Sequence, residues 1–359
     1  MSAIALPRQA AEAFRRQAEA CTSLGSPFTA ILCALVANGG VPAGPVHDRL
    51  ANWPGGLDGA VSDALALRLT GALHYLVLSG RDEQLAATYP PGNADRATIA
   101  SAVRAAITRH GEAIARFLDS PPQTNETGRS AILLPAFLYL GQQYGLPFVL
   151  SELGSSAGLN QNWHRYRYEY GRWGWGSLDS AVTIACEWEG EDPPRSLPVT
   201  IAESAGCDIA PVPIETGEDR LRLRSYVWPD QPTRLERLAG ALAIAADHPP
   251  SVEAAGAADW LAGRLGERRA GQLHAVFHTI MWQYLPRDEK TRLQAMIGDA
   301  GRGAAADAPL AWLRFEADGT PGSAGLALTV WDGSSPGGET VALARGDYHG
   351  RWIRWNPAA

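Results

Sequence analysis

A short apolar strand that runs into a glycine-rich turn is the feature that most restricts the fold of this chain. Residues 147–153 read Pro-Phe-Val-Leu-Ser-Glu-Leu, and a small-residue turn from Gly154 to Gly158 follows at once. Two kinds of active site use such a pattern. In a nucleotide-type loop, glycines let the backbone approach a ligand whose polar groups meet a nearby acid. In a nucleophile elbow of the G-x-S-x-G type, the serine, here Ser156, is the attacking group.

Composition and charge limit the class of protein. The chain has 359 residues, of which 46% are hydrophobic and 19% charged, values typical of a globular protein. Its net charge of −7 argues against nonspecific nucleic-acid binding, which uses a basic face. The four cysteines are scattered and no apolar run approaches the roughly 20 residues of a membrane span. We therefore expect a soluble cytoplasmic protein without a metal site, nucleic-acid partner or membrane partner.

The character of the chain changes near residue 145. Before that point it is rich in alanine and leucine, and periodicity predicts helices over 8–21, 27–37, 61–79, 94–119 and 129–144. Asn93 and Asp95 are both candidate caps for the fourth of these. After that point, strands are predicted over 147–153, 198–205, 251–255, 273–279 and 310–316, with helices over 231–247, 258–269 and 286–299. The sequence thus predicts a helical domain over 1–145 and an α/β domain over 146–359.

The alternation of strands and helices in the second part predicts crossover units and a mainly parallel sheet. The last strands differ, because 325–331, 340–344 and 352–355 are joined only by turns rich in Gly, Pro and Ser. They are typical of an antiparallel edge that extends the sheet.

The adenosyl-ligand interpretation of the turn requires an acid after the second strand. Asp208 follows the segment 199–207, and its carboxylate can accept hydrogen bonds from both hydroxyls of a ribose. Asp208 lies fifty residues beyond Gly158, whereas about 20 would be ordinary for such a unit. The aromatic segment 161–190 must then be an insertion.

The serine-hydrolase interpretation makes Ser156 the nucleophile. Asp208 or Asp259, followed by His278, would supply the acid and the base in the required chain order. A nucleophile elbow normally caps an interior strand, however, and no strand is predicted before residue 147. A tight turn that binds no ligand is the third interpretation.

Several further residues have both a functional and a structural interpretation. Asn125, Glu126 and Arg129 begin a helix, where they either cap it or form a substrate-recognition edge. His278 ends a predicted strand and is either a general base or a buried, hydrogen-bonded histidine. Asp259 follows the third strand and either binds an adenine amino group or caps a helix.

Residues in the predicted insertion are also open to two interpretations. Arg165 and Tyr166 begin an Arg-Tyr-Arg-Tyr run. They line a polar substrate pocket or lie with their apolar parts over the insertion.

Five separate segments carry a resemblance to a known family. They are 123–129, 152–160 with 165–168, 206–208 with Pro211, 227–230 and 349–352. On these segments the chain resembles the bacterial family called domain of unknown function 2332, over nearly its whole length. That family looks like a methyltransferase fold with a helical N-terminal addition. The chain departs from the general methyltransferase loop at Ser156, where glycine is usual.

The resemblance implies a Rossmann-like, methyltransferase-type α/β domain with a seven-stranded sheet and an antiparallel C-terminal edge. It implies S-adenosylmethionine as cofactor and methyl transfer to a small or peptidic acceptor as activity. The cofactor-binding candidates are then Glu152, Gly154, Ser156, Gly158, Asn160, Asp208 and Asp259. Asn125, Arg129, Arg165 and Tyr166 are the substrate-binding candidates, and His278 and Glu126 are the candidate bases. A serine hydrolase and a non-catalytic ligand-binding protein remain alternatives, and the oligomeric state is open.

Overall fold

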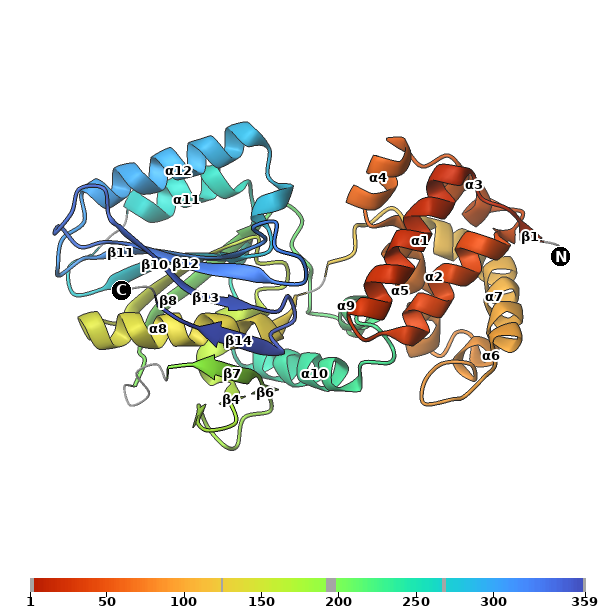
Figure 1. Cartoon of the computed structure of the whole chain (residues 1–359), viewed down its shortest axis with the longest axis horizontal. Coiled ribbons are helices and arrows are strands. Elements are labelled where there is room, and N and C mark those ends of the chain that lie inside the picture. The colour runs from red at the N-terminus through yellow and green to blue at the C-terminus, as the bar shows by residue number, and fades with distance from the viewer. Residues whose placement is uncertain (1–2, 124, 192–197, 267–268, 358–359) are drawn as a thin grey trace. The chain divides into compact units, whose positions relative to one another are not determined.

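A computed structural model of the chain describes residues 3–123, 125–191, 198–266 and 269–357. The chain forms two compact units (Figure 1). Unit 1 comprises Met1–Thr124 and Pro213–Glu236, and unit 2 comprises Asn125–Val212 and Arg237–Ala359. The sequence predicted one boundary near residue 145. The units differ from that division because the helix before residue 145 packs on the sheet, and because the segment after the second parallel strand returns to the helical unit.

Unit 1 is helical. Its helices are α1 (Arg8–Ser23), α2 (Pro27–Gly39), α3 (Pro45–Ala51), α4 (Gly56–Ser62), α5 (Leu65–Leu78), α6 (Glu83–Ala86), α7 (Arg96–Phe117) and α9 (Gly217–Ser225), and two short strands, β1 (Ala3–Ile4) and β2 (Val41–Pro42), pair antiparallel. Of the two candidate caps for α7, Asp95 is the one that the structure uses, since it accepts a hydrogen bond from the backbone N–H of Thr98. Helix α5 is buried over most of its length and contacts α1, α2, α7 and α9. It is the centre of this unit's core.

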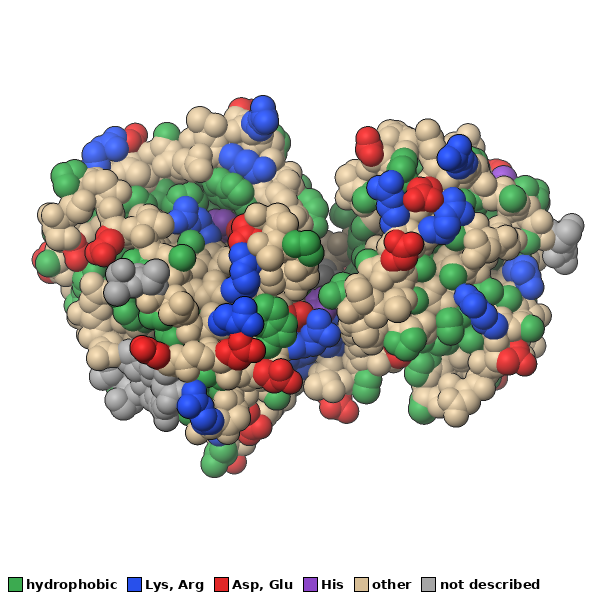
Figure 2. Space-filling view, viewed as in Figure 1, with side chains coloured by type: hydrophobic (Ala, Val, Ile, Leu, Met, Phe, Trp, Pro, Cys, Tyr) green, Lys and Arg blue, Asp and Glu red, His purple; other side chains and the backbone are tan. Residues whose placement is uncertain are grey.

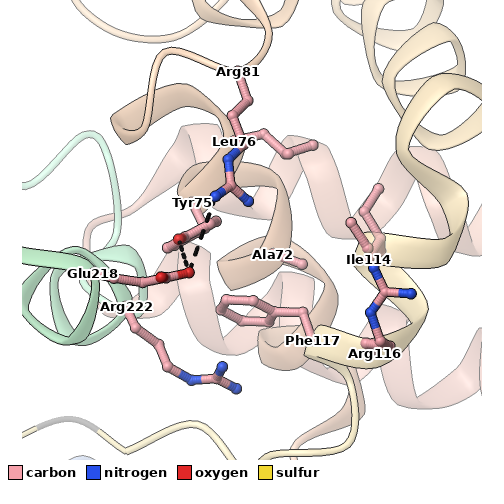
Figure 3. Close-up of a pocket in the computed structure, with 10 residues that line it drawn as sticks. Ala72, Tyr75, Leu76, Arg81, Ile114, Arg116, Phe117, Glu218 and Arg222 are labelled. Carbon is pink, nitrogen blue, oxygen red and sulfur yellow. Dashed lines mark hydrogen bonds and ion pairs between the residues drawn. The ribbon is translucent and has the colours of Figure 1, made fainter. Parts of the chain in front are cut away.

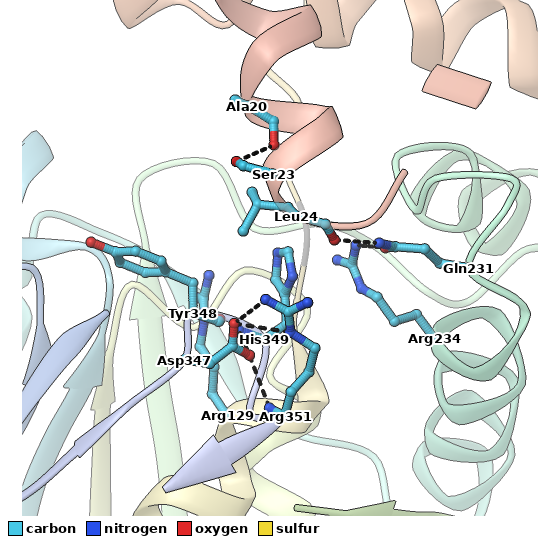
Figure 4. Close-up of polar contacts among 10 residues, drawn as sticks. All are labelled: Ala20, Ser23, Leu24, Arg129, Gln231, Arg234, Asp347, Tyr348, His349 and Arg351. Atoms are coloured by element: carbon cyan, nitrogen blue, oxygen red, sulfur yellow. Dashed lines mark hydrogen bonds and ion pairs between the residues drawn. The ribbon is translucent and has the colours of Figure 1, made fainter. Parts of the chain in front are cut away.

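The returning segment is fastened to unit 1 by its polar residues. The Asp230 carboxylate accepts a hydrogen bond from the backbone N–H of Phe28 at 2.7 Å, at the start of α2. Gln231 donates from its side-chain amide to the carbonyl of Leu24 at 3.1 Å (Figure 4). Asp230 therefore caps α2, whose own N-cap residue, Ser26, makes no side-chain capping hydrogen bond.

Unit 2 contains a nine-stranded sheet in the order β7-β14-β13-β12-β11-β10-β3-β8-β9. The strands are β3 (Phe148–Leu153), β7 (Glu187–Gly190), β8 (Ile201–Asp208), β9 (Val252–Ala254), β10 (Leu273–Thr279), β11 (Leu310–Glu316), β12 (Ala324–Trp331), β13 (Glu339–Gly346) and β14 (Trp352–Trp355). Five neighbouring strands of the sheet, in the order β9-β8-β3-β10-β11, are mutually parallel. The predicted antiparallel extension is confirmed in β12, β13 and β14.

Helices cover both faces of the sheet, so the fold is mixed α/β (Figure 1). They are α8 (Ser130–Tyr144), α11 (Ala257–Gly266) and α12 (Arg287–Arg302). The chain also forms α10 (Pro232–Asp247) and the short 3-10 turns η1 (Thr127–Arg129), η2 (Leu159–Arg165) and η3 (Trp282–Tyr284). In Figure 1, α11 and α12 lie above the sheet and α8 lies below it. Every residue of β10 is buried, as expected for a central strand covered on both faces.

The sheet has nine strands and not the seven that were expected, and the predicted insertion supplies one of them. The insertion forms a three-stranded sheet from β4 (Arg167–Glu169), β5 (Gly174–Trp175) and β6 (Thr183–Ala185). It then adds β7, which pairs parallel with β14 at the opposite edge of the large sheet from β9. The residues of β7 carry no local signal of this pairing, because the partner strand β14 lies far along the chain.

The visible surface of each unit carries interspersed acidic and basic side chains (Figure 2). Within the described ranges, no single helix combines the length and apolarity of a membrane span. Helices α4 and α5, which meet at a 47° bend, pass that test only as a pair.

Candidate functional site

The order of the parallel strands reverses between β3 and β10. From β3 the chain continues to β8 and β9 on one side, and it then crosses to β10 and β11 on the other. In open α/β sheets, ligands bind outside the carboxyl ends of the strands at such a reversal. The segments that follow β3, β8 and β10 are therefore where a ligand site is expected in unit 2.

The loop after β3 is a tight turn with three residues in the left-handed region. Their φ values are 68° for Gly154, 55° for Ser156 and 72° for Gly158. A Cβ at Gly154 would lie 2.9 Å from the Cβ of Met281, in the segment after β10. A Cβ at Gly158 would lie 2.6 Å from Cγ2 of Val252 in β9. Both glycines are needed for close approach as well as for backbone conformation.

Replacing Gly158 by alanine is expected to lower the free energy of unfolding by about 2–4 kcal/mol, because the left-handed backbone and the contact with Val252 both oppose a Cβ. Gly145→Ala is the matched control. Gly145 has a φ of 62° with no atom within 4 Å of an added Cβ, so backbone strain alone should cost about 1 kcal/mol there. Equilibrium denaturation of both variants measures the difference, and equal losses would contradict the role given to the contact.

Asp208 joins the loop after β3 to the end of β8. Its Oδ2 accepts a hydrogen bond from the backbone N–H of Ser156 at 2.9 Å, and its Oδ1 accepts one from that of Ala210 at 2.9 Å. A carboxylate has about four acceptor positions, so two partners do not exhaust it. Asp208 is half-buried and keeps the capacity to accept hydrogen bonds from a ligand.

Glu152, the fifth residue of β3, is a buried carboxyl group next to this aspartate. Only 2% of the residue is exposed, and its Oε2 has no hydrogen-bond partner among the described residues. Burial raises the pKa of Glu152 to about 8; the negative charge of Asp208 adds to this, while Ser155, Asn160 and Arg129 oppose it. The group is therefore mostly protonated at neutral pH, and a cation placed near it would favour its ionised form.

The segment that leads into α8 holds the loop from another side. Oδ1 of Asn125 accepts a hydrogen bond from the backbone N–H of Leu159 at 2.6 Å. The Ser130 hydroxyl donates to Oδ1 of Asn160 at 2.8 Å. Asn125 and Asn160, predicted from the sequence as substrate and cofactor ligands, thus help to fix the loop itself.

Glu126 and Arg129, also predicted as site residues, are engaged with neighbouring segments. The Glu126 carboxylate accepts a hydrogen bond from the backbone of η1 at 3.0 Å and lies 3.9 Å from Nη2 of Arg237. Arg129 donates from Nε to the carbonyl of Tyr348 at 3.0 Å and from Nη1 to that of Thr279 at 3.4 Å. Both residues hold η1 against the end of β10 and the loop between β13 and β14.

That loop is built around the buried carboxylate of Asp347. It accepts hydrogen bonds from the backbone N–H groups of His349 and Arg351, both at 2.9 Å, and from Nη2 of Arg351 at 2.8 Å (Figure 4). Burial would raise the pKa of Asp347, but the hydrogen bonds from Arg351 outweigh it and lower that pKa. A Cβ at Gly350 would lie 1.9 Å from the carbonyl oxygen of Gly128, so the loop packs directly on η1.

His278, a predicted base, is fully buried at the end of β10. Its Nδ1 lies 2.6 Å from Oε1 of Glu316, and Nε1 of Trp312 donates to its Nε2 at 3.2 Å. Because an indole N–H can only donate, Nε2 is the acceptor and Nδ1 carries the proton. Glu316 also accepts hydrogen bonds from the backbone N–H groups of Met281 and Trp282. In this arrangement both ring nitrogens are occupied, and His278 helps to position the segment after β10.

Asp259, Arg165 and Tyr166 are not brought to the loop as free ligand groups. Asp259 lies in the first turn of α11, where its carboxylate, 73% exposed, pairs with Arg292 at 2.6 Å. Tyr166 is fully buried and donates its hydroxyl to the carbonyl of Leu159. The Arg165 side chain is exposed at the end of η2.

Ser156, the predicted nucleophile of the alternative interpretation, has a buried hydroxyl. Its Oγ has no hydrogen-bond partner among the described residues. His278, the base that the sequence predicted for this serine, has its Nε2 occupied by Trp312. The described residues therefore supply no hydrogen-bonded serine–histidine pair at this loop, although the positive φ of Ser156 suits a strained elbow.

Two exposed apolar residues at the same edge of the sheet were missed by the sequence reasoning. Ile209, 83% exposed, follows Asp208 directly, and Tyr284, 70% exposed, closes η3 after β10. They stand on either side of β3 in the strand order. The position of Ile209 directly after Asp208, the predicted acid, was the sequence signal that could have identified it. Exposed large apolar side chains of this kind are suited to contact a flat ligand.

Within the parts of the chain that the structure describes, no group of three or more His, Cys, Asp or Glu side chains could hold a metal ion. The carboxylate and amide groups at the edge of the sheet instead accept hydrogen bonds from the loop backbone and from the Ser130 hydroxyl.

Comparison with known proteins identifies the family of this chain. Residues 11–355 match the family described as "Uncharacterized protein conserved in bacteria (DUF2332)". The chain belongs to this family. No curated protein and no solved structure matches it. In this DUF2332 protein, the segments 125–129, 152–160 and 206–208, which carried the resemblance, meet at the carboxyl edge of β3 and β8 through the hydrogen bonds described above.

Proposed function

We propose that this DUF2332 protein binds S-adenosylmethionine at the carboxyl edge of β3 and β8 and transfers its methyl group to a small or peptidic acceptor. The observation that carries the proposal is the link between the Asp208 carboxylate and the glycine loop at Ser156, at the point where the strand order reverses. The proposed arrangement is methyltransferase-like, with the parallel part of the sheet in the order β9-β8-β3-β10-β11.

The residues present fit the parts of such a cofactor. Asp208 keeps acceptor positions for the two hydroxyls of a ribose. The unpartnered Oε2 of Glu152 can accept a hydrogen bond from an ammonium group, whose charge would offset the cost of ionising a buried carboxyl. Ile209, exposed beside Asp208, offers an apolar face to the adenine. Asp259 is less suited to that role because its carboxylate is in an exposed ion pair.

The state of the two predicted bases limits the chemical class of the methyl acceptor. When bound, the sulfonium of the cofactor supplies a methyl carbon that is already activated for displacement, so the protein mainly has to align the acceptor. The nitrogens of His278 are both occupied, and Glu126 is buried and bound to η1. We therefore infer an acceptor with its own available lone pair, such as an amine or a thiolate, that needs no strong base from this chain.

The test is a calorimetric titration of the full chain with S-adenosylmethionine and with S-adenosylhomocysteine. Binding of both with micromolar dissociation constants is the expected result. Adenosine should bind at least tenfold more weakly, because it lacks the ammonium group that would meet Glu152. Absence of heat with both ligands at millimolar concentration would overturn the proposal.

A further inference from the structure

A second, independent pocket lies within unit 1, between α5, α7 and α9. Its volume is about 280 Å³. Its apolar floor includes Ala72, Leu76, Ile114 and Phe117, and Arg81, Arg116, Arg222 and Glu218 surround it (Figure 3). Two stretches distant in sequence build it, since α9 follows β8 whereas α5 and α7 lie in the N-terminal part.

The pocket is positively charged in a chain of negative net charge. Three arginines face one glutamate across it, whereas the whole chain carries a formal charge of −7. Like charges held together in a partly enclosed space repel one another unless an anion offsets them. Glu218 offsets part of this charge, because it lies 4.0 Å from Nη2 of Arg81 and accepts a hydrogen bond from the Tyr75 hydroxyl at 2.9 Å.

The other two arginines are not neutralised in this way. The Arg222 guanidinium lies 4.4 Å above the centre of the Phe117 ring, and its Nη2 is buried without a hydrogen-bond partner among the described residues. A buried donor that lacks a partner is costly, and a ligand acceptor would relieve that cost. Arg116 is exposed at the rim, and the described residues offer its side chain no ion pair.

The aromatic floor sets the shape of the ligand. Phe117 is tilted against Tyr75 and Tyr226, with ring centroids 5.5 and 5.6 Å away. Phe117 and Tyr75 line the pocket and give it an apolar wall, and Tyr226 supports Phe117. A site of this volume is at the lower end of the range for small-molecule sites, so it suits a single ring with its acid group.

We propose that this pocket binds a small organic anion, a carboxylate or phosphate carried on a flat apolar body. The acid group is bound by Arg116 and Arg222, and the apolar body packs on Phe117. Charge-assisted hydrogen bonds to arginine and burial of the ring together provide the affinity. The proposal does not depend on the cofactor site, since every residue that it uses lies in unit 1.

The experiment is a calorimetric titration of the full chain with benzoate and phenyl phosphate, with the neutral benzamide and inorganic phosphate as comparison probes. The two aromatic anions are expected to bind at least tenfold more tightly than either comparison probe, with an affinity that falls as salt is raised. Equal binding of benzamide and benzoate would overturn the role of the arginines. Equal binding of inorganic phosphate and phenyl phosphate would overturn the role of the ring.

Variants locate the site. Arg116→Gln removes an exposed charge at the rim and should weaken benzoate binding about tenfold, the usual loss for one charge-assisted hydrogen bond. Ala113→Leu, which adds volume at the pocket lining, should abolish it. Arg96→Gln is the matched control, because Arg96 is also exposed, lies at the other end of α7 and does not line the pocket. Unchanged benzoate binding in both pocket variants, each with a wild-type melting temperature, would refute the assignment.

Discussion

Glu152→Gln should stabilise the folded protein by about 3–4 kcal/mol at pH 8 while abolishing most of its affinity for S-adenosylhomocysteine. The folded state holds the carboxyl proton up to a pKa of about 8, because burial disfavours the charged form. The unfolded chain releases that proton near the ordinary value of 4.5. Raising the pH from 4.5 to 8 therefore favours the unfolded state, and a neutral glutamine removes this penalty.

The free energy of unfolding should be measured by denaturant titration from pH 6.5 to 8.5. Below that window, the buried His74 and the half-buried His164 also titrate, because burial lowers the pKa of each to about 4. The unfolded chain then binds protons that the folded state excludes. Wild type should lose stability as the pH rises through the window, and Glu152→Gln should not. Glu339→Gln, an exposed glutamate in the same unit, is the control and should follow wild type. Identical pH slopes for wild type and Glu152→Gln would disprove the buried-acid argument.

Ligand binding separates the two roles of this residue. If Glu152 only lowers the stability of the fold, the Glu152→Gln variant binds S-adenosylhomocysteine as well as wild type does. If it meets the ammonium group, wild-type affinity should rise with pH up to about 8, since below that pH the bound cation must first displace a proton. Titrations in buffers of different ionisation enthalpy measure that released proton directly. A residue that lowers stability and raises affinity is the usual compromise at a binding site.

Asp208→Asn is expected to weaken S-adenosylhomocysteine binding about 100-fold and to cost about 1–3 kcal/mol of stability. Both oxygens of Asp208 accept hydrogen bonds from backbone N–H groups, those of Ser156 and Ala210. An asparagine presents an NH₂ group to one of these donors, so one hydrogen bond is replaced by a repulsive contact. When that donor is Ser156, the loop keeps its backbone hydrogen bond to Cys207 but loses the one to residue 208. In either case the ligand loses an ionised acceptor.

The matched control is Asp259→Asn. Asp259 was the sequence's candidate for the adenine, but its exposed carboxylate is bound to Arg292. Surface pairs of this kind contribute at most about 1 kcal/mol, so this variant should melt and bind as wild type does. Calorimetry and thermal melting on both variants decide the matter. If Asp259→Asn weakens binding and Asp208→Asn leaves the affinity unchanged, the adenosyl group binds near Asp259 and not near Asp208.

Local patterns in the sequence were sufficient for most of the elements. The helices at 8–21, 27–37, 94–119 and 129–144, and the five parallel strands, are found within a few residues of their predicted bounds. Periodicity, caps and glycine turns act over a few residues, and so they can be read locally. The crossing of the chain to unit 1 and back after β8 was not predicted, because the local sequence of the segment 213–236 does not indicate which unit it packs on.

The candidate site divides in the same way. By itself the sequence determined that a tight turn follows β3 and that Asp208 belongs with it, because glycines and an acid after apolar strands leave strong local signals. Only the tertiary structure decided that both nitrogens of His278 are bound and that Oε2 of Glu152 is not. The state of His278 depends on Glu316 and Trp312, which are more than thirty residues from it in the chain. Whether a polar group is free to meet a ligand depends on such distant partners, and local residue patterns carry no record of them.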